Sequence, residues 1–204
     1  MGEGVQTISK KQRSERDINK GLNKAERFTL NTIESRIRNN KTESAWFVDE
    51  NGLIVGKATN GTETYVMIPK SQSKPNSIMT HNHPGVSLSD SMAGRIGRAF
   101  SSIDVNMAIE ANLKEIRAVT PTYTYSLKRP KKGWGDKKEI NKALTDMNVG
   151  YTMDREDYLM DREDYLNDRG SRQYLDRAAV VYRYRELKKV ADRFGWKLTR
   201  KKTA

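Results

Sequence analysis

The only two histidines of this 204-residue chain, His81 and His83, are separated by a single residue. They follow the apolar pair Ile78-Met79, which indicates a strand, and they precede Pro84-Gly85, a pair that ends strands and turns the chain. On an extended backbone, residues i and i+2 share a face. The spacing therefore predicts that both imidazoles project together from the end of a strand, a geometry that can hold a metal ion. Two surface histidines that lie close by chance would give the same short pattern.

Short apolar segments around this motif predict a sheet with helices before and after it. The order of elements favours an α+β fold, with a mixed sheet in a three-layer arrangement and a helical C-terminal extension. In the segment 64–68, Val66 and Ile68 are expected on one face. The predicted strands cover residues 44–49, 53–58, 64–68, 115–120, 123–128 and 196–199, with turns at 51–52, 60–61 and 121–122, and the predicted helices cover 24–39, 101–111, 137–146 and 171–194.

The net charge of +12 is unevenly distributed along the chain. Lys and Arg outnumber Asp and Glu by five in residues 1–42, by one in 43–130 and by six in 131–204. We therefore expect a basic flexible arm over 1–23, a nearly neutral metal-binding domain over 24–130, and a basic helical extension over 131–204 that packs on or beside the core. The flanks could contact nucleic acid weakly, whereas the central domain lacks the charge of a nucleic-acid-binding core.

Three further features of the sequence bear on the setting of the protein and on its C-terminal part. The absence of cysteine excludes disulfides and thiolate ligands, and fits an intracellular or virion-interior protein. No apolar run approaches the length of a membrane span, so no membrane partner is expected. The heptad MDREDYL occurs twice in succession, over 153–159 and 160–166, which permits self-association but is also typical of a charged surface helix.

Two carboxylates and a serine add to the histidine pair. Glu43 precedes the strand-like run Ser-Ala-Trp-Phe-Val, and Ser101 and Asp104 form an S-x-x-D pattern at the expected start of a helix. Each also has a structural interpretation: Glu43 as a solvated carboxylate at a strand edge, and Ser101 with Asp104 as a helix cap. Asp90, in Ser87-Leu88-Ser89-Asp90, is a competing candidate for a third metal ligand beside the histidines.

The order Glu43, His81-Asn82-His83-Pro84 and Ser101-x-x-Asp104 resembles that of JAMM/MPN-type zinc metalloproteases. The segment looks most like the JAMM-related domains of phage head proteins and bacterial toxin-type proteins, over roughly residues 25–130. This resemblance implies a fold similar to that of cytidine deaminases and a zinc ion held by His81, His83 and Asp104. It also implies Glu43 as the acid–base residue and Ser101 as a donor to the oxyanion. The gap between His83 and Ser101 is longer than the family pattern.

Three functions are consistent with these observations. The first is a zinc metallopeptidase or isopeptidase, a hydrolase that cleaves an amide bond in a protein or peptide substrate. The second is a non-catalytic phage protein, associated with head proteins, that retains the fold. The third is a basic nucleic-acid-associated factor, similar to RadC-type domains, which share the H-N-H-P signature. Metal content separates the first from a metal-free second, and Glu43→Gln should keep zinc yet lose hydrolysis if the first is right. Loss of nucleic-acid retention on deletion of the two flanks would support the third as a property of the arms.

Overall fold

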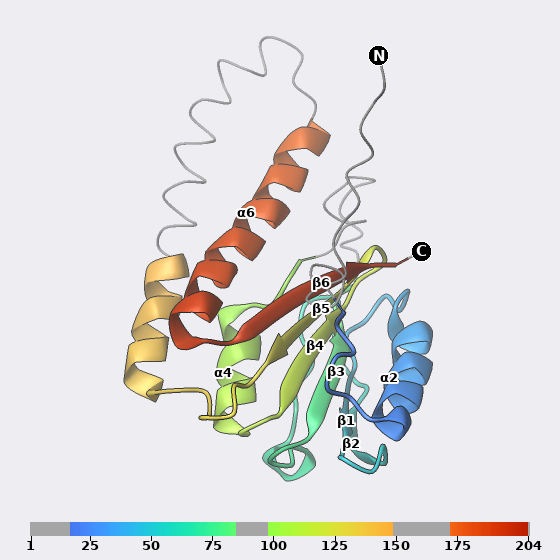
Figure 1. Cartoon of the computed structure of the whole chain (residues 1–204). Coiled ribbons are helices and arrows are strands. Elements are labelled where there is room, and N and C mark those ends of the chain that lie inside the picture. The colour runs from blue at the N-terminus through green and yellow to red at the C-terminus, as the bar shows by residue number, and fades with distance from the viewer. Residues whose placement is uncertain (1–16, 85–97, 149–171, 204) are drawn as a thin grey trace, which may run out of the picture.

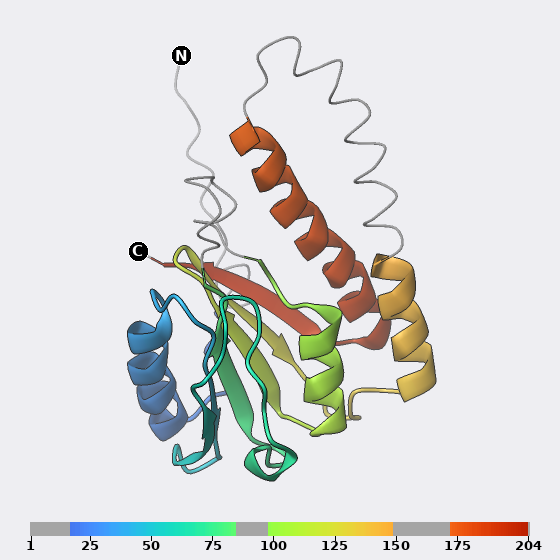
Figure 2. The same ribbon diagram turned by 180° about the vertical axis from the view of Figure 1, so that it is seen from behind.

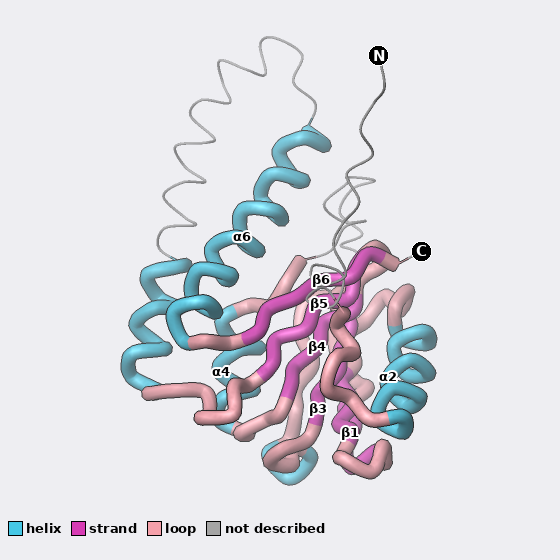
Figure 3. Tube along the Cα trace, viewed as in Figure 1, coloured by secondary structure: helices cyan, strands magenta, loops and turns pink. Residues whose placement is uncertain are grey.

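The computed structural model of the chain describes residues 17–84, 98–148 and 172–203, and its centre is a six-stranded mixed sheet. The strand order is β2-β1-β3-β4-β5-β6 (Figures 1 and 3). β3 and β4 pair in parallel, and the other neighbouring strands pair antiparallel. The strands are β1 (Ala45–Val48), β2 (Ile54–Ala58), β3 (Ile78–Asn82), β4 (Glu115–Val119), β5 (Tyr123–Lys128) and β6 (Lys197–Lys202).

Helices cover both faces of this sheet, which makes the arrangement three-layered (Figures 1 and 2). One face carries α2 (Lys24–Ile37), and the other carries α4 (Ser102–Glu110), a helix over 137–148, and α6 (Arg172–Phe194). A short 3-10 helix, η1 (Lys70–Gln72), contacts β2. The predicted α+β class with a mixed sheet and flanking helices is confirmed at this level. In the described part of the chain, no helix is both long and apolar enough to cross a membrane.

The two faces of β3 lead to two separate apolar clusters. Ile78 packs with α2, whereas Met79 belongs to the larger cluster shared with α4 and α6. Thr80 follows the same alternation, because its hydroxyl donates to Glu34 of α2 at 3.3 Å. His81 therefore projects from the sheet toward the side of α4, as the period of a strand requires.

The predicted hairpin between β1 and β2 is confirmed, and its turn also fits the start of α2. Gly52 has a φ of +76°, a conformation that glycine adopts without steric cost. A Cβ at this position would lie 2.7 Å from the backbone of Ala25, so only glycine allows the hairpin to approach the helix. The helix itself begins with a capping box formed by Asn23 and Glu26.

A group of buried charges lies between the sheet and α2 and was not anticipated from the sequence. Arg117 of β4, fully buried, forms ion pairs with Glu34 at 2.6 Å and with Glu115 at 3.3 Å. Lys128 lies 3.4 Å from the second oxygen of Glu115. Buried charges of this kind are tolerated because each has an opposite charge beside it.

Residues 17–22 pack against the fold, although the sequence placed them in the flexible arm. Ile18 and Leu22 are buried, and the side chain of Asn19 accepts hydrogen bonds from Arg117 at 3.3 Å. The Lys128 ammonium donates to the carbonyls of Ile18 and Lys20, at 2.8 and 2.7 Å. The folded part of the chain therefore extends across the predicted boundary at 23/24, because Leu22 joins the apolar cluster under α2.

The C-terminal region contributes to the same core as the central domain. Trp196 donates its indole N–H to the carbonyl of Trp134 at 2.7 Å, and Trp134 donates to that of Leu113 at 3.0 Å. The predicted helices at 137–146 and 171–194 are confirmed, as 137–148 and Arg172–Phe194, and the predicted last strand is β6. The duplicated heptad at 153–166 and Asp90 lie outside the described residues.

The predicted strand at 64–68 is wrong as a sheet element. The segment has the expected facial pattern, because Val66 and Ile68 are half-buried against the core while Tyr65 and Met67 are exposed. Its backbone, however, joins no strand of the described sheet. The Thr62 hydroxyl instead accepts from the Tyr65 amide at 3.2 Å, which closes a local turn at its start.

Candidate metal centre

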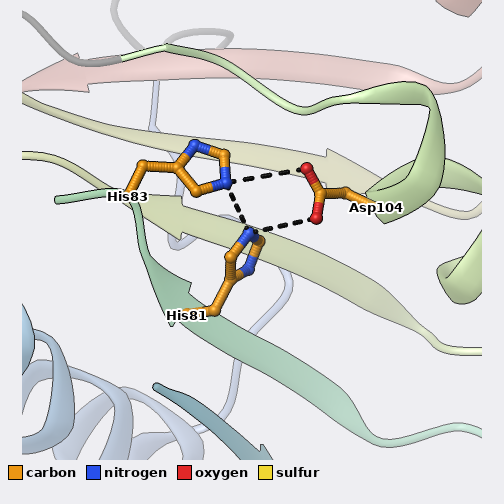
Figure 4. Close-up of side chains that lie close together, drawn as sticks. All are labelled: His81, His83 and Asp104. Atoms are coloured by element: carbon orange, nitrogen blue, oxygen red, sulfur yellow. Dashed lines mark hydrogen bonds and ion pairs between the residues drawn. The ribbon is translucent and has the colours of Figure 1, made fainter. Parts of the chain in front are cut away.

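His81 and His83 lie together at the end of β3, as the spacing predicts. Their Nε2 atoms are 2.8 Å apart, and the rings meet edge to face with centroids 4.6 Å apart (Figure 4). The backbone of His83 is fixed by donation of its N–H to the carbonyl of Val119 at 2.9 Å, just beyond the paired part of β3 and β4. The two rings therefore point their Nε2 atoms toward each other.

Asp104 faces the two imidazoles from the first turn of α4. Its Oδ1 lies 3.4 Å from His81 Nε2, and its Oδ2 lies 3.6 Å from His83 Nε2 (Figure 4). One ligand atom from each of the three residues lies within 4.8 Å of the other two. The structure thus brings together the three residues predicted as metal ligands, although they lie on two different elements and span 24 positions of the sequence.

The N-terminal cap of α4 orients the Asp104 carboxylate. Ser101 is the N-cap: its hydroxyl accepts from the Asp104 amide at 3.1 Å, and its own amide donates to Oδ2 at 2.6 Å. The Ser101 hydroxyl also lies 2.7 Å from Oδ2 and donates to it. The capping interpretation of this pair is confirmed, and it is compatible with metal binding. In this arrangement the hydroxyl proton of Ser101 points to Asp104, so donation to an oxyanion would require it to turn.

The outer nitrogen of His83 has a partner that fixes the ring. Nδ1 lies 2.8 Å from the carbonyl of Arg98, which can only accept, so Nδ1 carries the proton and Nε2 of the neutral ring keeps its lone pair. Nδ1 of His81 is buried without a partner of good hydrogen-bond geometry. Burial lowers the pKa of that ring, and the Arg117 backbone only partly opposes this effect. His83 is therefore the better oriented of the two rings.

Burial and mutual charge set the protonation of the three residues. Burial lowers the pKa of His81, although Asp104 opposes this effect. Burial also acts to lower the pKa of His83, but Asp104, the Arg98 carbonyl and Glu43 outweigh it, and the pKa rises. Burial acts to raise the pKa of Asp104, yet the two imidazoles hold it well below its usual range. Asp104 is consequently an anion, as a metal ligand must be.

Glu43 lies on the same face as the histidines, just before β1. β1 and β3 pair antiparallel with Ala45 opposite His81, and continuing this register sets Glu43 opposite His83. Burial raises the pKa of Glu43 to about 7, with His83 opposing and Asp104 adding to the effect. A carboxyl group with this pKa can both accept and release a proton near neutral pH.

The backbone of Glu43 is held by the turn at Gly61. The Glu43 amide donates to the carbonyl of Thr62 at 2.7 Å. A Cβ on Gly61 would lie 2.2 Å from the Glu43 carbonyl oxygen, which explains the need for glycine in the predicted turn at 60–61. Gly61 and Thr62, which precede the segment 64–68, thus hold the backbone of Glu43 in place.

A single cavity of about 350 Å³ contains all five residues predicted for the site, Glu43, His81, His83, Ser101 and Asp104. Part of its lining is apolar and comes from Tyr65, Val66 and Ile68 and from Ile103 and Met107 of α4. Two of these apolar side chains, Tyr65 and Ile103, are 58% and 77% exposed. The other lining residues are Glu63, Thr64, Met79, Pro84, Arg98, Ala99 and Arg183.

The donor set fits zinc. Two imidazole nitrogens and one carboxylate leave a position open in a tetrahedral site, as in catalytic zinc centres, whereas magnesium and calcium prefer oxygen ligands alone. Ligand atoms about 2.1 Å from a tetrahedral ion are about 3.4 Å apart. The nitrogen–oxygen distances of 3.4 and 3.6 Å are of this size but involve different oxygens of Asp104, so the carboxylate would have to turn for one oxygen to bind together with both nitrogens. The two nitrogens, at 2.8 Å, are closer and would have to separate slightly.

Comparison with known proteins adds no information about this site. The chain matches no protein-family model, no curated protein and no solved structure.

Proposed function

We propose that the chain is a zinc-dependent metallopeptidase or isopeptidase of the JAMM/MPN type, which hydrolyses an amide bond in a protein substrate. The observation that carries the proposal is the convergence of two imidazoles, one ionised carboxylate and a second carboxyl group with a pKa of about 7 in one cavity. The order of the motifs and the three-layer mixed sheet agree with a JAMM-like fold. The motif order also favours an origin in a phage or mobile element, with a location in the virion or the bacterial cytoplasm.

The residues of the chain divide the reaction between them. His81, His83 and Asp104 would hold the ion, whose charge polarises a carbonyl and lowers the pKa of a water molecule at the open position. Glu43, which lines the same cavity, would take a proton from the attacking water and return it to the leaving amine. Ser101 holds Asp104, and its hydroxyl is the candidate donor to an oxyanion.

The apolar wall of the cavity supports a protein substrate. Tyr65 and Ile103 are exposed there, and a peptide segment could cover such surface with its own apolar side chains. Groups with shifted pKa values are concentrated at functional sites, so the raised pKa of Glu43 beside the candidate ligands favours a catalytic site over a non-catalytic module or a nucleic-acid-associated protein.

Elemental analysis and one substitution test the proposal. The purified full chain should contain one zinc per molecule, and Glu43→Gln should keep the zinc yet abolish cleavage of a library of internally quenched linear and lysine-branched peptides. Glu63→Gln is the matched control, because Glu63 is an exposed glutamate of the same cavity. Full activity of zinc-loaded Glu43→Gln would refute the role of Glu43. Iron in place of zinc would instead indicate an oxygenase, since the same donor set also binds iron(II).

A further inference from the structure

The residue between the two histidines makes an unusual set of contacts. Asn82 is fully buried, and its side chain points to the face of β3 opposite the imidazoles, where Thr80 and Ile78 also lie. Its Oδ1 accepts from both the amide and the hydroxyl of Ser44, each at 2.9 Å. Its Nδ2 donates to the carbonyl of Thr42 at 2.9 Å. The side chain therefore binds the residues immediately before and after Glu43.

The side chain of Asn82 takes the place of one backbone hydrogen bond between β1 and β3, next to the candidate metal centre. In the antiparallel register of β1 and β3, Ser44 lies opposite Asn82, and such a pair would normally exchange two backbone hydrogen bonds. One of these is present, from the Asn82 amide to the Ser44 carbonyl at 3.2 Å. The other is taken over by the amide side chain, because the Ser44 amide donates to Asn82 Oδ1. The ladder ends one residue before Glu43 and His83, while the two segments stay connected.

We infer that Asn82 is a positioning residue that fixes Glu43 relative to the metal ligands. The inference rests on the proposed function for its chemical meaning. Asn82 shares its backbone with His81 and His83 and holds the Glu43 segment by three hydrogen bonds, so one residue sets the distance between the acid–base group and the ligands. An amide side chain suits these three bonds, because its oxygen accepts two hydrogen bonds while its separate NH2 group donates the third.

The test compares Asn82→Ala with Thr80→Val in the full-length protein. Thr80 is equally buried on the same face of β3, but its hydroxyl contacts Glu34 rather than the Glu43 segment. Asn82→Ala should lower kcat by about 100-fold, because small displacements of a reacting group have effects of this size, with KM and zinc affinity unchanged. Thr80→Val should leave kcat within about twofold of the wild-type value.

A second readout does not depend on activity. In the metal-free protein, the Ser44 amide is buried and bonded to Asn82, so its hydrogen exchange should be slow in the wild type and in Thr80→Val and much faster in Asn82→Ala. If Asn82→Ala fails to fold, Asn82→Asp serves instead: it keeps the acceptor for Ser44 and loses the donor to Thr42. This variant should keep Ser44 protected and still lose activity.

Two results would overturn the inference. An unchanged kcat in zinc-loaded Asn82→Ala would show that Glu43 needs no such support, and a loss of zinc affinity equal to the loss of kcat would assign Asn82 to the histidines instead. If the wild-type protein cleaves no peptide, the proposed function fails by itself. Exchange at Ser44 then still decides whether Asn82 holds this segment, and unchanged exchange in Asn82→Ala would refute it.

Discussion

Replacement of Glu43 by Gln should stabilise the metal-free protein, and the gain should grow with pH. Burial raises the pKa of Glu43 from its ordinary value of 4.5 to about 7, so between these values the native state binds a proton that the unfolded chain does not. Stability conferred on the wild type by this group is therefore present at low pH and is lost as the pH rises toward 7. By linkage, the raised pKa lowers the free energy of unfolding of the wild type by about 3 kcal/mol at pH 8, against about 1 kcal/mol at pH 5. The neutral amide of Gln avoids this cost.

Urea unfolding of the chelator-treated protein at about pH 5 and about pH 8 measures the effect. Glu43→Gln should have a higher free energy of unfolding than the wild type, and this difference should be about 2 kcal/mol larger at the higher pH than at the lower. Glu63→Gln removes the same charge from an exposed position of the cavity and should change little at either pH. Zinc should reduce the gain, because a cation beside Glu43 favours its ionised form. An equal gain at both pH values would refute the raised pKa as its cause.

Three further predictions concern the ligands and the buried charges. Zinc affinity should weaken as the pH falls through the raised pKa of His83, because the protonated ring cannot bind; calorimetric titration at several pH values would show a constant affinity if this is wrong. Ser101→Ala should lower stability by about 1 kcal/mol and zinc affinity about tenfold, as read from urea unfolding and chelator competition, because it removes the cap and a bond to the carboxylate ligand. Arg117→Ala should destabilise the protein by about 3–5 kcal/mol in thermal unfolding, since it leaves two buried glutamates without their partner; a change below about 1 kcal/mol would contradict this.

Most elements of the fold could be predicted from the sequence because their patterns are local. The hairpin at Gly52 and the cap at Ser101 depend on turn and capping chemistry within a few residues, and both are confirmed. The segment 64–68 shows the limit of this approach. The alternation of its residues correctly predicts which side chains are buried. Whether the segment pairs with another strand depends on a part of the chain that is distant in sequence, and a local pattern carries no information about that part.

The residues of the candidate site could be predicted where they belong to a short sequence motif. They could not be predicted where their contacts join segments that are distant in the sequence. His81, His83 and Asp104 converge as expected, and Glu43 lines the same cavity. Asn82 was not predicted as a site residue, because the partners of its side chain, Ser44 and Thr42, lie 38 and 40 positions away in the sequence. Arg117 looked like an ordinary strand residue, and nothing in its own segment revealed the glutamate of α2 that makes its burial possible.

The outermost strand β6 determines how the sheet can be extended. Within the described part of the chain it pairs with β5 on one side only, and it carries Lys197, Arg200, Lys201 and Lys202. A second copy that approached strand to strand would bring like charges into contact, so this border resists growth into fibrils. An extended segment rich in aspartate or glutamate would meet no such repulsion. The basic end of the chain thus discourages self-assembly at this border while leaving it open to acidic strands.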